Sequence, residues 1–209
     1  MELRIGFLAS HNGSNLQAIL ENISSGYLKA KPMVLITNNS NAKASKIADD
    51  SCLVSICLNK KDYPQIFVSL DEAIAETLKE YDVNLVVLAG YMNKIGPLTL
   101  SAYKNRILNI HPALLPKYGG DGMYGWFVHE AVLRAGEKES GATVHMLNED
   151  YDKGPILARC KVSVYPEDDV NTLAKRVLKV EHQLYSQVLR DIQLDRIDLD
   201  CMSGLSLPD

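Results

Sequence analysis

The first half of the chain alternates between short apolar runs and segments whose apolar residues recur at helical spacing. Branched and aromatic residues predict strands at 3–9, 32–37, 52–58 and 83–89. Amphipathic helices are expected between them, over about 16–23, 39–50 and 69–81. Strands that alternate with helices across short connections are typical of a parallel sheet with helices on both faces. The pattern therefore predicts an α/β fold.

The second half is less regular. We expect a short helix after Pro97, strands at 106–110, 142–147 and 156–164, a helix across 127–133 and a long amphipathic helix over about 170–189. No internal repeat, low-complexity tract or linker interrupts the chain. We therefore predict one domain over residues 1–190, with residues 191–209 as a polar and poorly ordered tail.

Composition narrows the class of protein. The chain has 209 residues, of which 46% are hydrophobic, and its formal net charge of -4 argues against a broad nucleic-acid surface. The longest apolar stretch, 85–90, is too short to cross a membrane, and the first residues lack the features of a signal peptide. The four cysteines form no C-x-x-C pair and no cluster with histidine. These features predict a cytoplasmic protein with reduced thiols and no bound metal.

The segment Asn-Ile-His-Pro-Ala-Leu-Leu-Pro-Lys follows a buried strand and begins at Asn109. Pro112 stops the strand, so Asn109 and His111 lie where the strand leaves its sheet. Residues two apart in a strand project to one side, so the amide and the imidazole can converge on one small volume. Local sequence equally allows an ordinary turn, with Asn109 bonded to the backbone and His111 packed on the surface.

A second candidate site, Asn12-Gly13-Ser14-Asn15, lies between the first strand and the first helix. Free backbone N–H groups and the positive end of the helix dipole make such a position suitable for an anion. The motif matches neither the dinucleotide nor the triphosphate fingerprint. An ordinary helix cap by Ser14 or Asn15 is the alternative, and a cap is compatible with phosphate binding.

Asp152 lies in the turn before the last strand. It is either a solvated turn residue or a carboxylate beside His111 that raises the pKa of the imidazole. Among the other histidines, His11 is expected to be exposed and His129 to pack at the surface or half-buried. His145 alternates with Val144 and can point toward the same pocket as His111.

Several motifs match a known family. They are Gly13-Ser14-Asn15-Leu16-Gln17-Ala18, residues 86–92, Leu108-Asn109-Ile110-His111-Pro112, residues 114–118, Thr143-Val144-His145, Asp152-Lys153-Gly154-Pro155 and Glu181-His182. In these motifs the chain resembles the phosphoribosylglycinamide formyltransferases, a folate-dependent family, over roughly residues 3–189. The resemblance implies an open, Rossmann-like, mostly parallel sheet with helices on both faces.

The resemblance also implies an activity. Such an enzyme transfers a formyl group from 10-formyltetrahydrofolate, its cosubstrate, to the amine of 5'-phosphoribosylglycinamide in purine (IMP) biosynthesis. The reaction passes through a tetrahedral intermediate and needs no metal. The expected partners are small molecules only, without nucleic acid or membrane, and the expected state is a monomer or homodimer. The alternatives are a formyltetrahydrofolate hydrolase, a methionyl-tRNA formyltransferase, which would need a basic RNA-binding face, and a non-catalytic folate or nucleotide binding module.

Roles are implied residue by residue. The catalytic residues are Asn109, His111 and Asp152, with Asp152 keeping His111 protonated. The substrate phosphate and glycinamide are assigned to Gly13, Ser14, Asn15 and Glu181. The folate pocket is assigned to Met92, Asn93, Lys94, Ile95 and Asn109.

The chain departs from the family pattern at several places, three of which concern the substrate end of the site or the loop 119–125. His11 stands where the family usually has glycine, at the rim of the phosphate loop. The family often has a basic residue three before Glu181, where this chain has Leu178 with Lys179 next to it. The loop 119–125 resembles an insertion, and its role is open.

Overall fold

The computed structural model describes residues 2–59, 61, 69–150 and 152–204. These residues form a seven-stranded sheet in the order β3-β2-β1-β4-β5-β6-β7. The strands are β1 (Leu3–Leu8), β2 (Ala30–Thr37), β3 (Ser55–Cys57), β4 (Leu85–Leu88), β5 (Ile107–His111), β6 (Glu139–Met146) and β7 (Ile156–Ser163). Pairing is parallel from β3 through β5 and antiparallel between β5 and β6 and between β6 and β7. The predicted mostly parallel α/β sheet is confirmed.

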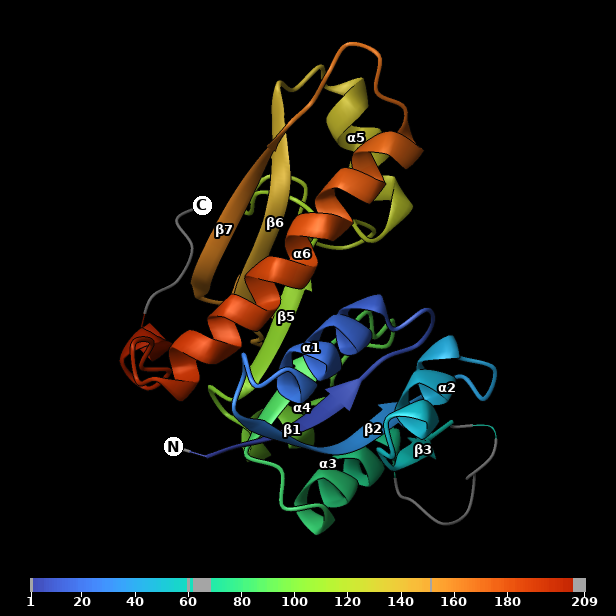
Figure 1. Cartoon of the computed structure of the whole chain (residues 1–209), viewed down its shortest axis with the longest axis vertical. Coiled ribbons are helices and arrows are strands. Elements are labelled where there is room, and N and C mark those ends of the chain that lie inside the picture. Colours follow the sequence, from blue (N-terminus) through green and yellow to red (C-terminus); the bar gives the residue numbers. More distant parts are fainter. Residues whose placement is uncertain (1, 60, 62–68, 151, 205–209) are drawn as a thin grey trace.

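Helices cover both faces of the sheet (Figure 1). They are α1 (Ser14–Ser24), α2 (Lys43–Asp50), α3 (Leu70–Glu80), α4 (Pro97–Ala102), α5 (Trp126–Arg134), α6 (Val170–Gln193) and a 3-10 turn η1 (Cys201–Gly204). One buried cluster joins α1, α2, α5 and α6 to the sheet, and a second joins α3 and α4 to the opposite face. Among the described residues, no helix is long and apolar enough to span a membrane.

Two helices begin where the sequence offers a cap. The Ser69 hydroxyl accepts a hydrogen bond from the Glu72 N–H at 3.1 Å and caps α3, which begins at Leu70 within the predicted helical range 69–81. At α6, Asp169 and Thr172 form a reciprocal capping box. These caps satisfy N–H groups that the first helical turn leaves without a partner in the helix.

The end of the chain differs from the prediction. Helix α6 runs on to Gln193, and Leu199 beyond it is only 4% exposed against the core. Arg106 also forms a two-pronged ion pair with Asp200, with both N···O distances 2.8 Å. The expectation of a poorly ordered tail is therefore wrong for residues 191–204, because apolar residues continue to find the core. Residues 205–209 lie outside the described residues.

The strand order creates a crevice at one edge of the sheet. Strand β1 lies between β2 and β4, so the connections from β1 and β4 leave in opposite directions. In open α/β sheets, ligands bind outside the carboxyl ends of the strands at such a switch point. The turn after β1, the segment after β4 and the end of β5 all lie at this edge.

Candidate active site

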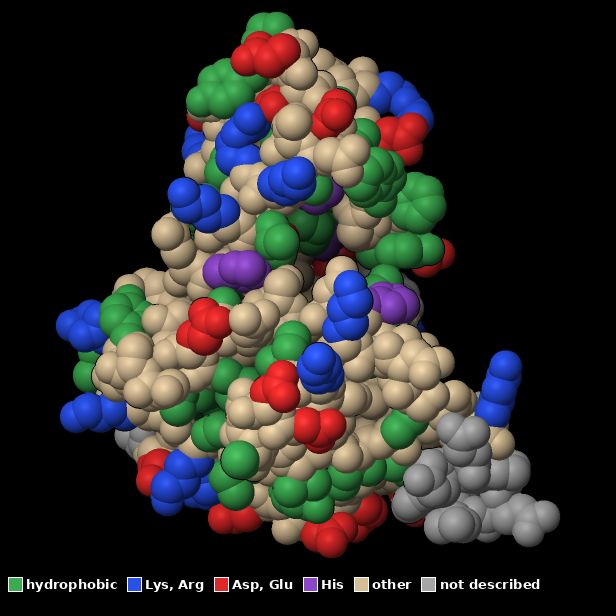
Figure 2. All heavy atoms as spheres, turned by 45° about the vertical axis from the view of Figure 1, so that its right-hand side comes forward, with side chains coloured by type: hydrophobic (Ala, Val, Ile, Leu, Met, Phe, Trp, Pro, Cys, Tyr) green, Lys and Arg blue, Asp and Glu red, His purple; other side chains and the backbone are tan. Residues whose placement is uncertain are grey.

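A pocket of about 920 Å³ occupies this crevice. Figure 2 shows a hollow in the surface, with histidine side chains in and around it. Every residue that the sequence assigned to a site lines the pocket, namely Gly13, Ser14, Asn15, Met92, Asn93, Lys94, Ile95, Asn109, His111, Asp152 and Glu181. The fold thus brings together segments that are far apart in the sequence.

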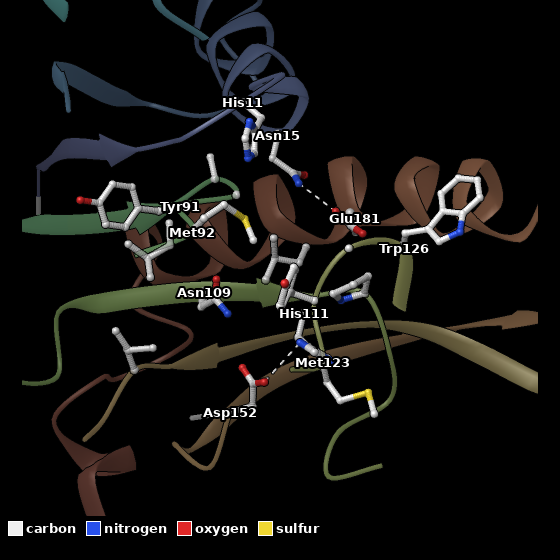
Figure 3. A pocket seen from close by; sticks show the side chains of 18 of the residues that line it. His11, Asn15, Tyr91, Met92, Asn109, His111, Met123, Trp126, Asp152 and Glu181 are labelled. Atoms are coloured by element: carbon white, nitrogen blue, oxygen red, sulfur yellow. Dashed lines mark hydrogen bonds and ion pairs between the residues drawn. The ribbon is translucent and has the colours of Figure 1, made fainter. Parts of the chain in front are cut away.

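His111 is the last residue of β5 and is 3% exposed. Its Nε2 lies 2.7 Å from the carbonyl oxygen of Tyr118, which can only accept, so Nε2 carries a proton. Its Nδ1 lies 3.5 Å from Oδ2 of Asp152 (Figure 3). The proton that His111 gains or loses is therefore the one on Nδ1, beside the carboxylate.

Burial and the Asp152 carboxylate shift the pKa of His111 in opposite directions. Burial lowers the pKa of His111 below its ordinary value, and the nearby Asp152 carboxylate and the bond to Tyr118 oppose this only in part. Asp152 does act in the predicted direction. Burial lowers the pKa of His111 by more than Asp152 raises it, so the net shift is downward.

Asp152 is held as a carboxylate. Burial alone raises its pKa, but hydrogen bonding to His145, the charge of His111 and the Gly120 N–H together outweigh burial, so the pKa of Asp152 lies below its ordinary value. The Gly120 N–H donates to Oδ2 at 3.0 Å. Asp152 therefore links the loop after β5 to both His111 and His145.

His145 lies directly across from Asn109 in the β5–β6 pairing and is fully buried. Its Nδ1 donates to the Met146 carbonyl at 3.0 Å, and its Nε2 lies 3.1 Å from Nδ2 of Asn109 and 3.5 Å from Oδ1 of Asp152. This contact orients the Asn109 amide and leaves its second N–H for another acceptor. The sequence placed His145 near the pocket but gave it no role, because cross-strand register is not visible in local sequence.

At the other wall, α1 begins after Gly13, whose backbone is left-handed at φ 68°. The alternative of a cap by Ser14 or Asn15 is wrong, because the N-cap is Gly13 and the Asn15 amide instead donates to Oε2 of Glu181 at 2.8 Å. Glu181 is 8% exposed, and burial raises its pKa against the opposing bond from Asn15.

Helix α6 is fixed in place near Glu181. Tyr185, one turn further along, is fully buried, and its hydroxyl lies 2.8 Å from the Leu108 carbonyl and 3.2 Å from the Leu88 carbonyl. These contacts join α6 to the ends of β4 and β5. Glu181 is therefore held at a set distance from Asn109 and His111.

The segment after β4 forms a third wall. The Met92 N–H donates to the Ser10 hydroxyl at 2.8 Å, and the Ser10 N–H donates to the Gly90 carbonyl at 3.0 Å. Met92 is 43% exposed to the pocket side, whereas Ile95 is buried. The wall thus combines apolar surface with backbone groups, as is common in small-molecule sites.

The loop 119–125 and His129 also line the pocket, and sequence reasoning did not assign them to it. His129 is 5% exposed, so the expectation of surface or half-buried packing is wrong. Burial and, to a smaller extent, the charge of His111 together lower its pKa to about 4. The sequence feature that could have indicated this part of the pocket is a run of glycines followed by Met123, Tyr124 and Trp126. Within the described ranges, no group of three histidine, cysteine or acidic side chains could hold a metal ion.

Comparison with known proteins identifies the family. Residues 3–189 match the family model described as formyl transferase. A phosphoribosylglycinamide formyltransferase of Haemophilus influenzae is 34% identical over 209 residues, covering 98% of this chain and 96% of the relative. The chain belongs to the phosphoribosylglycinamide formyltransferase family. Because the match covers nearly all of both chains, it includes every wall of the pocket.

Two further relatives extend the comparison. A crystal structure of glycinamide ribonucleotide transformylase 1 from Symbiobacterium toebii superposes with a TM-score of 0.87 at 36% identity, covering 94% of this chain and 90% of that one. A chloroplastic phosphoribosylglycinamide formyltransferase of Arabidopsis thaliana is 40% identical over 93% of this chain. The chain spans 66% of that relative's length. The formyltransferase fold and family are thus shared with both bacterial and plant proteins.

Proposed function

We propose that this protein transfers a formyl group from 10-formyltetrahydrofolate to the amine of 5'-phosphoribosylglycinamide, a step of purine biosynthesis. The observation that carries the proposal is the convergence of Asn109, His111 and Asp152 at the end of β5, inside one pocket. Membership of the formyltransferase family supports the reaction type. The names of the relatives support the acceptor.

The formyl donor binds along the segment after β4. Met92 and Ile95 supply apolar contact, and the backbone of Asn93 and Lys94 supplies polar groups for the edge of the folate ring. Asn109 lies between this wall and His111 (Figure 3). This position directs the formyl carbon of the donor toward the Asn109 amide and the His111 ring.

The acceptor binds between α1 and α6. The N–H groups at the start of α1, over Gly13, Ser14 and Asn15, take the phosphate, since the positive end of the helix dipole favours an anion. The Glu181 carboxylate then accepts a hydrogen bond from the glycinamide amine. Because Asn15 donates to Glu181 at 2.8 Å, the phosphate end and the amine end of the site are physically joined.

The chemistry needs donors placed at one oxygen. The amine nitrogen attacks the formyl carbon, a new C–N bond forms, and the carbonyl electron pair becomes an oxyanion. The free N–H of Asn109 and the Nδ1 proton of His111 stabilise that charge, and one such donor can be worth about 10²–10³ in rate. The bond between the carbon and the folate nitrogen then breaks, and the amine proton is transferred to the leaving nitrogen.

Asp152 makes the imidazole an effective donor during this step. Although burial lowers the pKa of His111, Asp152 raises it, so the carboxylate lowers the cost of forming the imidazolium. As negative charge grows on the substrate oxygen, a proton on Nδ1 is stabilised both by that oxygen and by the Asp152 carboxylate. Protonation of His111 is thus coupled to formation of the oxyanion.

Product analysis tests the proposal. Purified protein is incubated with 10-formyltetrahydrofolate, with and without phosphoribosylglycinamide, and the products are separated by mass. We expect formylated phosphoribosylglycinamide and tetrahydrofolate in equal amounts, and no folate product without the acceptor. Release of free formate at the same rate in both incubations would show a hydrolase and overturn the proposal.

A further inference from the structure

The start of α1 differs from the starts of α3 and α6. Ser69 and Asp169 cap those helices, whereas no side chain among the described residues caps α1, and its first turn has no acidic residue. The N–H groups of this turn and the positive end of the helix dipole therefore face the pocket uncompensated. Under the proposed function, on which this inference rests, they bind the substrate phosphate.

A buried acceptor beside this turn gives an independent sign of a ligand. Asn15 is 8% exposed, and its Nδ2 is bonded to Glu181. Its Oδ1 is buried and has no hydrogen-bond partner in the described part of the chain. Because buried polar atoms in native proteins are nearly always satisfied, Oδ1 fits a donor group supplied by the ligand.

His11 and Lys175 add two basic side chains to the lining of the pocket. His11 immediately precedes the loop, and its carbonyl accepts a hydrogen bond from the Ala44 N–H at 3.1 Å, which holds the backbone. Its side chain and that of Asn15 both line the pocket (Figure 3). Lys175 lies on α6 six residues before Glu181, or about 9 Å along the helix axis, and lines the same pocket.

Lys175 differs from two other basic residues, Arg176 and Lys161, in its ion pairing. Arg176, the next residue, is held by Asp168 at 2.6 Å, and Lys161 is held by Glu139 at 2.8 Å. Lys175 is exposed and forms no ion pair with any described residue. Leu178, one turn closer to Glu181 on the pocket side, is apolar. The positive charge on this side of α6 therefore comes from Lys175.

We propose that His11 and Lys175 bind the phosphate monoester of the acceptor substrate, together with the N–H groups at the start of α1. The ammonium group of Lys175 supplies a charge-assisted hydrogen bond, and the imidazole of His11 supplies a second donor. The two residues compensate for the absence of a basic residue at Leu178. They make the site selective for a phosphorylated acceptor over its dephosphorylated nucleoside.

Calorimetric binding tests the role of Lys175 without relying on turnover. The full-length protein is titrated with phosphoribosylglycinamide and with the dephosphorylated glycinamide riboside. In Lys175→Met, we expect the dissociation constant for the phosphorylated ligand to rise about 5- to 20-fold and that for the riboside to stay the same. Lys179→Met is the matched control, since Lys179 is exposed on the same helix and is not among the residues lining the described pocket. It should match wild type for both ligands.

The same titrations with His11→Gly test the second residue. We expect a rise of about 2- to 5-fold for the phosphorylated ligand alone, and weaker competition by inorganic phosphate in both variants. Equal losses for the two ligands, or no loss for either, would overturn the inference. Weakened binding of 10-formyltetrahydrofolate instead would assign Lys175 to the folate carboxylates and also overturn it. Because binding is the readout, these outcomes are separate from failure of formyl transfer.

Discussion

At the residue scale, the balance between burial and one carboxylate sets the protonation of His111. The ring is 3% exposed, and burial lowers its pKa while Asp152, with Oδ2 3.5 Å from Nδ1, raises it. Nε2 is bonded to the Tyr118 carbonyl and keeps its proton. The opposing effects of burial and Asp152 therefore decide how readily Nδ1 takes up a proton. Nδ1 is the atom that we propose faces the oxyanion.

Asp152→Asn removes the charge that opposes burial. We expect the pKa of His111 to fall further, so the midpoint of its titration followed by NMR moves to lower pH. Glu149→Gln removes another carboxylate that lines the pocket but is not among the causes of the shift, and it should leave the midpoint unchanged. A midpoint in Asp152→Asn that stays the same or rises would contradict the claim that Asp152 raises the pKa of His111.

Sequence could identify some site residues and not others. Asn109 and His111 are two apart at a strand end, and this spacing with the family motifs placed them in the pocket. His145 was assigned no role, because its contact with Asn109 depends on the antiparallel register of β5 and β6. His129 was misplaced, because its spacing on α5 does not reveal which face α6 and the sheet cover.

At the element scale, the start of α1 depends on a single backbone conformation. Gly13 adopts φ 68°, and a Cβ there would lie 2.8 Å from Ala44 Cβ and 2.9 Å from its Cα. The left-handed turn thus lets α1 begin against α2 with its N–H groups directed at the pocket. Motif spacing predicted the loop, but its contact with α2 is visible only in the structure.

Gly13→Ala is expected to destabilise the fold by about 1–3 kcal/mol and to weaken binding of phosphoribosylglycinamide, because both strain and contact shift the start of α1. Gly26→Ala is the matched control, since Gly26 has φ 77° and open space around it. It should lose stability through strain and keep wild-type binding. Urea unfolding and calorimetry give the two quantities, and unchanged binding in Gly13→Ala would contradict the role of this turn.

At the scale of the whole molecule, alternation of strands and helices predicted the parallel part of the sheet well. The antiparallel strands β6 and β7 were located, but their pairing was not predicted, because two short strands do not reveal direction. The polar composition of 191–209 concealed the apolar residues that dock. Leu199 belongs to the same buried cluster as β1 and α6, which closes this side of the molecule.

Leu199→Ala is expected to lower the free energy of unfolding by about 2–4 kcal/mol, because it leaves a cavity in a packed cluster. Leu194→Ala removes the same atoms from a side chain that is 40% exposed, and we expect a loss of about 0.5 kcal/mol or less. Urea unfolding of both variants checks this difference. Equal losses would mean that the end of the chain is not part of the core.

The most direct test of the account is a single-turnover measurement on His111→Ala with both substrates bound. Wild type and variant are saturated with 10-formyltetrahydrofolate and phosphoribosylglycinamide, and the dissociation constants are measured separately. We expect binding within a few-fold of wild type and a rate of formyl transfer lower by about 10²–10³, since one oxyanion donor is lost. An unchanged rate of transfer would contradict the claim that His111 stabilises the intermediate.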